Sequence, residues 1–218
     1  MKIVVLSCDK NEDTFKPFHW CMEEYFPCHP EIIYFTESIK NPYYKTISIP
    51  HELNEWTRGL REFLKWIDDE HILLMIDDIF IRKPVDIVRL GQADSCLKGN
   101  IACFNMEKSW DRYDQETELE GWKKREHGRE YEVSLMCGLW DKEKLLKVID
   151  RDCDPWTIEL EQDSKGFDYY INSGDYIIDW GYRTLQPVGI QKGKWTRECV
   201  EFLKSKGFDL DWNKRGIV

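Results

Sequence analysis

The stretch HILLMIDDIF, residues 71–80, decides the fold class. Its five consecutive apolar residues, 72–76, do not alternate with polar ones, which predicts a central parallel strand buried on both faces. The run ends in two adjacent carboxylates, Asp77 and Asp78. Ligands bind at the carboxyl ends of strands in open α/β sheets, so the pair marks a candidate site. A turn cap beside a solvated carboxylate is the competing interpretation of an isolated acidic pair.

The segments before this strand complete a β-α-β-α-β order. Residues 2–8 (KIVVLSC) and 31–37 (EIIYFTE) are short, apolar and β-branched, as expected for strands. Apolar residues at helical spacing predict helices over 14–26 and 54–67. This order predicts an α/β fold with a mostly parallel central sheet flanked by helices.

The second half of the chain has a looser pattern. Apolar runs predict strands at 100–105, 131–140 and 176–180, and Asp141 and Asp154 are expected to cap two helices. The polar residues 107–130 predict a long loop or a hairpin of helices over one end of the sheet. Since there is no repeat or linker, one domain over residues 1–218 is the simplest organisation.

The composition limits the function classes. The 31 Lys and Arg residues against 41 Asp and Glu give a net charge of −10, which argues against extended nucleic-acid binding. The eight cysteines are scattered without a CxxC pair and indicate reduced thiols. No secretion signal or membrane-spanning run is recognisable, so a cytoplasmic protein is expected. The ten tryptophans suit either a large core or stacking platforms for sugar or base rings.

Three further segments contain candidate site residues. Ser7, Cys8, Asp9 and Lys10 follow the first strand and share an edge of the sheet with the acidic pair. In PWTIELE, a carboxylate beside Trp156 has the setting of a general base, and Glu159 is that candidate. In GIQKGKW, residues 189–195, Lys192 and Lys194 flank a glycine that lets the backbone approach an anion. An ordinary loop, a solvated helix face and a surface turn are the respective structural alternatives.

Taken in order, these segments resemble small bacterial and viral nucleotide-sugar glycosyltransferases of the GT-A fold. The resemblance rests on KIVVLSCDKN, WTRGLREFLKWIDDEHILLMIDDIF, SLMCGLWDKEKLLKVI with DPWTIELE, and GIQKGKW. Residues 105–130 match least. The usual Asp-x-Asp signature is altered, because Ile79 stands third after Asp77, and Phe80 third after Asp78.

The resemblance implies transfer of a sugar from a nucleotide sugar, expected to be a UDP-sugar, to an acceptor hydroxyl. It implies Mn²⁺ or Mg²⁺ at Asp78 and Asp77, and inversion with Glu159 as general base. An acceptor pocket would contain Trp156 and Trp140. The residues expected to bind the nucleotide are Ser7, Cys8, Asp9, Lys10, Trp56, Asp77, Lys192 and Lys194.

The sequence leaves the acceptor and the function class open. A glycan, a lipid-linked sugar, a protein or a modified DNA base could accept the sugar. A metal-dependent nucleotidyltransferase would share the acidic residues at the sheet edge, and a non-catalytic sugar-binding module would also explain the tryptophans. Release of UDP or of pyrophosphate distinguishes the two enzymes.

Overall fold

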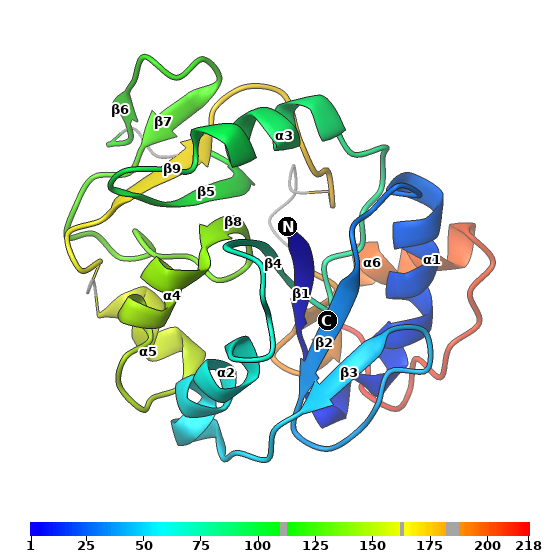
Figure 1. Cartoon of the computed structure of the whole chain (residues 1–218). Helices are drawn as coiled ribbons and strands as arrows, with labels where there is room; N and C mark the ends of the chain where they lie inside the picture. Colours follow the sequence, from blue (N-terminus) through cyan, green and yellow to red (C-terminus); the bar gives the residue numbers. More distant parts are fainter. Residues whose placement is uncertain (110–112, 162–163, 182–187) are drawn as a thin grey trace.

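A nine-stranded mixed sheet organises the chain (Figure 1). The computed structural model describes residues 1–109, 113–161, 164–181 and 188–218. Within them the strand order is β3-β2-β1-β4-β8-β5-β9-β7-β6. The strands are β1 (Lys2–Leu6), β2 (Ile32–Thr36), β3 (Lys45–Ser48), β4 (His71–Ile76), β5 (Ile101–Lys108), β6 (Gln115–Glu116), β7 (Trp122–Lys124), β8 (Cys137–Asp141) and β9 (Asp168–Asn172).

The strand directions bring several chain segments to one edge of the sheet. β1 is parallel to β2 and β4, and β2 is parallel to β3. β8 runs antiparallel between β4 and β5, while β9 is parallel to β5. The carboxyl ends of β1, β2, β4, β5 and β9 and the amino end of β8 therefore meet at one edge, here named the carboxyl edge. The predicted α/β fold with a mostly parallel central sheet is confirmed.

Helices cover both faces of the sheet. Each helix packs with the buried apolar cluster on its own face. One face carries α1 (Phe15–Tyr25), α3 (Ile87–Cys96) and α6 (Arg197–Ser205), and the other carries α2 (Trp56–Leu64), α4 (Lys142–Val148) and α5 (Pro155–Leu160). The expected caps are present, since Asp141 accepts the Lys144 N–H at 3.0 Å and Asp154 accepts the Thr157 N–H at 2.9 Å.

The central position of β4 explains its unbroken apolar run. Leu73 and Met75 face the α1 side, Ile72 and Leu74 face the α2 side, and all four are fully buried. A strand with two buried faces has no polar positions.

Two predictions for the second half are wrong. Residues 176–180 do not form a strand. The strand in this part of the chain is β9, which ends at Asn172. Ile177, Ile178 and Trp180 are apolar because a loop carries them into the core. Residues 107–130 are not a hairpin of helices in their described part, where β7 pairs with β9 and β6 pairs with β7 to extend the sheet.

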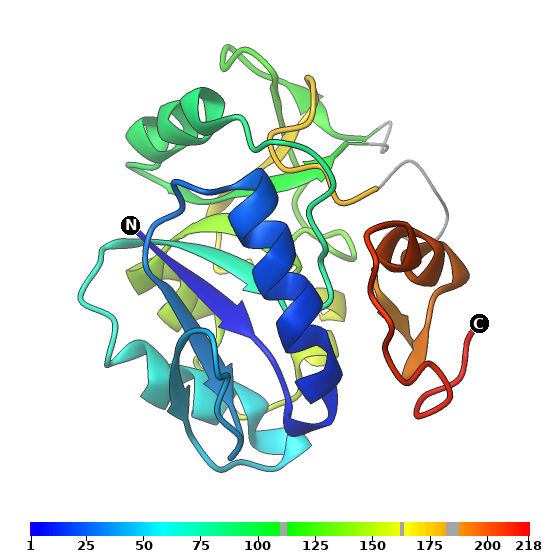
Figure 2. The same ribbon diagram turned by 90° about the vertical axis from the view of Figure 1, so that its right-hand side faces the viewer.

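A small hairpin stands against the carboxyl edge. It consists of β10 (Ile190–Gln191) and β11 (Lys194–Trp195), joined by a turn in which Lys192 and Gly193 have φ of 50° and 76°. Two positive φ values in sequence are the geometry of a tight two-residue hairpin turn. Figure 2 shows this hairpin with α6 and the C-terminal segment on one side of the main sheet. Among the described helices, none has the length and apolar character needed to cross a membrane.

Candidate active site

Asp77 is a buried hub at the carboxyl edge. Its Oδ2 accepts a hydrogen bond from Ser7 Oγ at 2.5 Å and lies 3.2 Å from Thr14 Oγ1, and its Oδ1 accepts one from Asn11 Nδ2 at 2.9 Å. Burial, reinforced by the neighbouring Asp78 charge, raises the pKa of Asp77 to about 8 despite these donors. Asp77 is therefore mainly protonated at neutral pH, and it fixes the loop that follows β1.

Asp78 holds the hairpin in place. Its Oδ2 accepts the Ile190 N–H at 3.0 Å, and its backbone carbonyl accepts the Gly189 N–H at 2.8 Å. A Cβ at Gly189 would lie 2.4 Å from the Phe80 ring, so only glycine allows this approach. Burial raises the pKa of Asp78 to about 6, against the opposing effect of the Ile190 N–H and the Arg215 charge.

We expect Asp77→Asn to keep the fold and to change how stability depends on pH. An asparagine can accept from Asn11 and donate to Thr14, whose hydroxyl already donates to the Asn11 carbonyl at 2.7 Å. A raised carboxyl pKa contributes stability that is full below the unfolded value of about 3.9 and is lost as the pH rises through the folded value. The free energy of unfolding of Asp77→Asn in urea, relative to that of wild type, should therefore increase from pH 6 to pH 9.

Asp77→Leu is the matched comparison for this prediction. It leaves the buried Ser7 and Thr14 hydroxyls facing an apolar group and should cost about 1–3 kcal/mol of unfolding free energy at both pH values. If Asp77→Asn loses as much as Asp77→Leu at pH 6, the protonated hub is wrong.

The other residues predicted after β1 have structural roles in this conformation. Asp9 Oδ1 accepts the Ser38 and Ile39 N–H groups at 3.0 and 3.1 Å, which ties the loop after β1 to the loop after β2. Burial, with Asp77 and Glu37 adding to it, raises the pKa of the Cys8 thiol to about 11, so it stays uncharged. Lys10 is exposed. The structure thus brings Ser7 to Asp77, and directs Asp9 toward Ser38.

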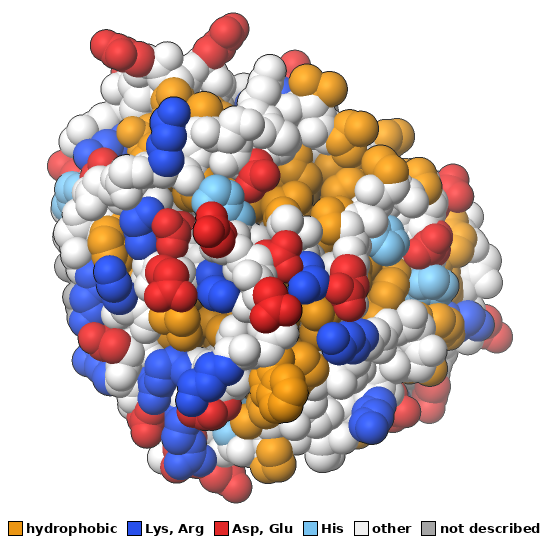
Figure 3. Space-filling view, viewed as in Figure 1, with side chains coloured by type: hydrophobic (Ala, Val, Ile, Leu, Met, Phe, Trp, Pro, Cys, Tyr) orange, Lys and Arg blue, Asp and Glu red, His pale blue; other side chains and the backbone are white. Residues whose placement is uncertain are grey.

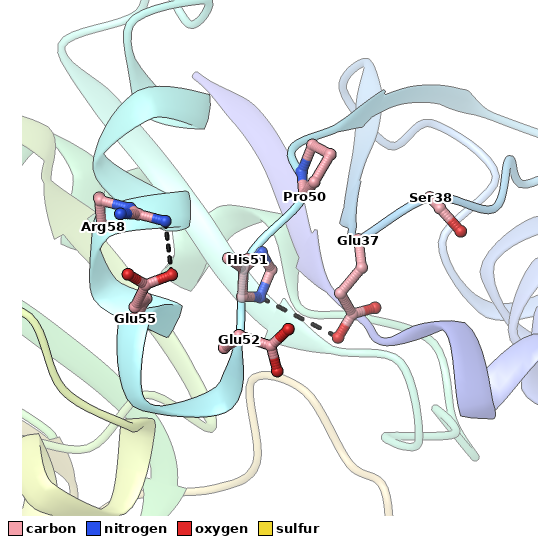
Figure 4. A pocket seen from close by; sticks show the side chains of 7 residues that line it. All are labelled: Glu37, Ser38, Pro50, His51, Glu52, Glu55 and Arg58. Atoms are coloured by element: carbon pink, nitrogen blue, oxygen red, sulfur yellow. Dashed lines mark hydrogen bonds and ion pairs between the residues drawn. The ribbon is translucent and has the colours of Figure 1, made fainter.

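A pocket of about 330 Å³ lies beside this loop, where β2 ends and α2 begins (Figure 4). Glu37 connects the two, because its Oε2 accepts the Asp9 N–H at 2.7 Å while its Oε1 faces the pocket residue His51 at 4.0 Å. The His51 ring stacks on Phe35 with centroids 5.1 Å apart. Trp56 is buried against Phe35 rather than lining the pocket. The lining residues are Glu37, Ser38, Pro50, His51, Glu52, Glu55 and Arg58.

Sequence reasoning missed this pocket, although one signal was present. Glu37 and Ser38 follow the predicted strand 31–37 directly and so belong to the same edge as Asp77. His51 and Arg58 gave no such signal, because only the turn of the chain into α2 brings them beside Glu37.

Glu159 is connected to β4 through the segment that precedes β8. Its Oε1 accepts the Leu135 N–H at 2.8 Å, and its backbone carbonyl accepts the Tyr131 N–H at 2.8 Å. The next residue, Met136, accepts the N–H of Ile76, which directly precedes Asp77. Burial raises the pKa of Glu159 to about 7 against the Leu135 N–H, with Glu107 adding to the increase. Oε2 has no hydrogen-bond partner among the residues described here.

A buried ion pair that the sequence analysis did not identify lies behind Glu159. Glu107, the next-to-last residue of β5, pairs with Arg125 at 3.3 Å, and Arg125 Nη1 also donates to the Tyr131 carbonyl. Burial raises the pKa of Glu107 even beside the guanidinium. Arg125 thereby fixes the segment 131–135 that binds Glu159.

The two tryptophans expected in an acceptor pocket lie apart. Trp140 is fully buried on β8 and packs against Tyr169, so in this structure it offers no surface to an acceptor. Trp156 is 57% exposed on α5 and remains accessible. Glu159 is half-buried and is held by the backbone of segment 131–135 through the Leu135 and Tyr131 N–H groups.

Only part of the expected metal site fits a divalent cation. Among the described residues, no three His, Cys, Asp or Glu side chains are grouped closely enough to hold a metal ion. Both oxygens of Asp77 already accept hydrogen bonds, whereas Asp78 uses Oδ2 for one backbone N–H. Mg²⁺ commonly takes one or two carboxylates and completes its shell with phosphate and water oxygens. Asp78 fits this role, and Asp77 does not.

Comparisons with known proteins identify the fold. The sequence matches no protein-family model and no curated protein. A cytidylyltransferase from Leptospira borgpetersenii aligns with a TM-score of 0.57 at 12% identity, over 97% of this chain and 88% of that one. A CMP:2-keto-3-deoxy-manno-octonic acid synthetase, in complex with CTP, aligns with a TM-score of 0.53 at 12% identity, over 95% and 98% of the two chains.

A glycosyltransferase is similar to the same degree. An active-site mutant of the galactosyltransferase LgtC aligns with a TM-score of 0.52 at 11% identity, over 99% of this chain and 100% of that one. The chain spans 52% of a bifunctional IspDF from Campylobacter jejuni and 59% of a fragment of TarS from S. aureus. The protein therefore has the α/β fold that glycosyltransferases and nucleotidyltransferases share.

Proposed function

We propose that this protein is a glycosyltransferase that transfers a sugar from a nucleotide sugar, a UDP-sugar in the first instance, to an acceptor hydroxyl with inversion. The observation that carries the proposal is the position of Glu159. The Glu159 carboxylate has a pKa of about 7, and one of its oxygens has no hydrogen-bond partner among the described residues. Its other oxygen binds Leu135, and the following residue, Met136, accepts the N–H of Ile76, which directly precedes Asp77 on the chain. Such a group suits a general base that acts near neutral pH.

The donor would lie along the carboxyl edge. We assign its nucleoside to the pocket between Glu37 and Arg58, one strand away from β1, and its diphosphate to the acidic pair and the hairpin. Lys192 and Lys194 are exposed on that hairpin and can neutralise phosphate charge. A cation on Asp78 would stabilise the negative charge that develops on the leaving diphosphate.

The chain supplies the proton acceptor that the reaction needs. Glu159 Oε2 takes the proton of the acceptor hydroxyl, and the acceptor oxygen forms a bond to the anomeric carbon. The bond from that carbon to the diphosphate oxygen breaks on the opposite face, and the nucleoside diphosphate departs with the electron pair. The exposed Trp156, on the same helix as Glu159, offers a ring surface on which an acceptor sugar can stack.

A metal-dependent nucleotidyltransferase is the second candidate. The same pocket, with Lys192, Lys194 and a cation on Asp78, would also suit a nucleoside triphosphate. Nucleotidyl transfer to a phosphate or carboxylate oxygen starts from an anion and needs no general base. Glu159 would then have no chemical role, whereas a nucleotidyltransferase with a hydroxyl acceptor would use it as a base. The difference therefore favours the glycosyltransferase over nucleotidyl transfer to an anionic acceptor.

The burial of several tryptophans argues against a sugar-binding module, and the surface charge does not favour extended DNA binding. The tryptophans Trp140, Trp180 and Trp195 are buried in the core instead of forming an exposed platform. Acidic and basic side chains are interspersed on the face of the molecule shown in Figure 3. The acceptor classes that remain are a glycan, a lipid-linked sugar, a protein or a single modified base.

A screen by thermal unfolding tests the proposal. UDP, CDP, GDP, UDP-sugars and CTP are added with Mn²⁺, with Mg²⁺ or with EDTA. We expect a UDP compound at a hundred times its dissociation constant to add about 2.7 kcal/mol of stability. Uridine and free pyrophosphate are the control ligands and should each add less.

Analysis of the released product then separates the two enzymes. Release of UDP from a stabilising UDP-sugar supports glycosyl transfer, whereas release of pyrophosphate from CTP supports the second candidate. If no nucleotide raises the unfolding temperature under any of these conditions, both transferase assignments are wrong.

A further inference from the structure

The C-terminal segment, residues 212–218, forms part of the carboxyl edge. Trp195 of β11 donates its N–H to the Gly216 carbonyl at 3.0 Å and accepts the Val218 N–H at 2.9 Å. β11 pairs with β10, whose first residue, Ile190, is bonded to Asp78. This pairing brings Arg215, which is far from the acidic pair in sequence, beside the hairpin that carries Lys192 and Lys194.

The guanidinium of Arg215 is held rigidly. Nε and Nη2 donate to the two oxygens of Asp13 at 2.8 and 2.6 Å, and Nη2 also donates to Asn11 Oδ1 at 3.0 Å and to the Lys10 carbonyl. Asn11 in turn donates to Asp77. The side chain is only 9% exposed. The plane of the guanidinium is therefore fixed relative to the acidic pair.

One nitrogen of this group is left over. Nη1 has no hydrogen-bond partner in the described part of the chain, and it is not enclosed, so solvent reaches it. The Arg215 charge acts on Asp77, Asp78 and Cys8, which places it within electrostatic range of the acidic pair. A fixed guanidinium with an unpaired, accessible edge is suited to bind a phosphate oxygen.

We propose that Arg215 binds the diphosphate of the donor through Nη1, so that the C-terminal segment is a structural part of the donor site. This inference rests on the proposed function. Asp13 and Asn11 act as positioning residues that aim the guanidinium. The contact adds a fixed positive charge to the exposed charges of Lys192 and Lys194, on the side of the edge where Asp77 lies.

Calorimetric titration of UDP, uridine and pyrophosphate, each with EDTA and with Mn²⁺, tests the assignment. Arg215→Gln is expected to weaken UDP about 10- to 100-fold, the range for a lost hydrogen bond to a charged group, while uridine binds as before. Arg215→Lys keeps the charge but loses the fixed geometry, so it should weaken UDP by about 10-fold. Lys214→Gln, a change at the exposed neighbouring residue, is the matched control and should leave the affinities for UDP and uridine unchanged.

The outcomes separate the two proposals. Wild type that binds UDP, with a UDP-to-uridine affinity ratio that falls in both Arg215 variants and not in Lys214→Gln, supports the assignment. Equal weakening of UDP and uridine, together with a lower unfolding temperature, means that Arg215 only clamps the C-terminal segment and overturns it. If Arg215→Gln does not fold, the ratio in Arg215→Lys decides. Wild type that binds none of the three ligands under either condition overturns the proposed donor site and this assignment with it.

Discussion

Asp78→Asn is expected to reduce turnover by about 10³-fold, the several kcal/mol of charge stabilisation that a catalytic cation supplies. Asp78 is the carboxylate of the acidic pair that retains an oxygen without a hydrogen-bonding side chain, whereas Asp77 is saturated by Ser7, Asn11 and Thr14. The asparagine oxygen can still accept the Ile190 N–H, so the hairpin should stay in place. Steady-state kinetics with saturating donor and Mn²⁺ measures the loss.

Two further measurements make this prediction specific. The unfolding temperature of Asp78→Asn should equal or exceed that of wild type, because a buried carboxylate is replaced by a neutral amide that can still accept the Ile190 N–H. Mn²⁺ binding in the presence of UDP, followed by electron paramagnetic resonance, should weaken in Asp78→Asn and persist in Asp77→Asn. Near wild-type turnover of Asp78→Asn would show that Asp78 serves only to hold the hairpin.

The central part of the fold was predictable because burial on two faces leaves a clear trace in sequence. Residues 72–76 of β4 are all apolar, and β1 and β2 have short β-branched runs for the same reason. The caps Asp141 and Asp154 were equally visible, because a side-chain acceptor at a helix start is a local feature.

The sheet margin was not predictable on the same grounds. β6 and β7 are two and three residues long and largely polar, so the pairing of β7 with β9 and of β6 with β7 leaves no period in the sequence. The apolar residues 177 and 178 led to the prediction of a strand that is absent, since a loop can enter the core without forming a strand.

The candidate site divides in the same way. Asp77, Asp78 and Ser7 were identified because they follow strands directly, and strand ends share an edge. Arg215 and His51 reach that edge through the packing of the C-terminal segment and of the chain before α2, which no local pattern records. Trp140 shows the limit of reading residue types alone, because a large aromatic residue serves a core as well as a pocket.

Glu159→Gln is expected to reduce turnover by about 10²- to 10⁴-fold, the usual contribution of a general base. Glutamine can still accept the Leu135 N–H, so segment 131–135 and the donor site should be undisturbed, and UDP affinity should stay within about twofold. Because Glu159 acts only when deprotonated and its pKa lies at about 7, wild-type turnover should rise with pH up to about that value and then level off. The variant should lose this rise.

Glu161→Gln is the matched control, because Glu161 lies just after the same helix, exposed and paired with Arg151 instead of the segment before β8. It should turn over like wild type. The anomeric configuration of the product, read by NMR, adds a second criterion, since a base that activates the acceptor hydroxyl for direct attack requires inversion. A retained configuration, or a wild-type pH profile in Glu159→Gln, would remove Glu159 from the reaction. Glu159 would then act only as an anchor for residues 131–135, and the main argument for a glycosyltransferase over a nucleotidyltransferase would be lost.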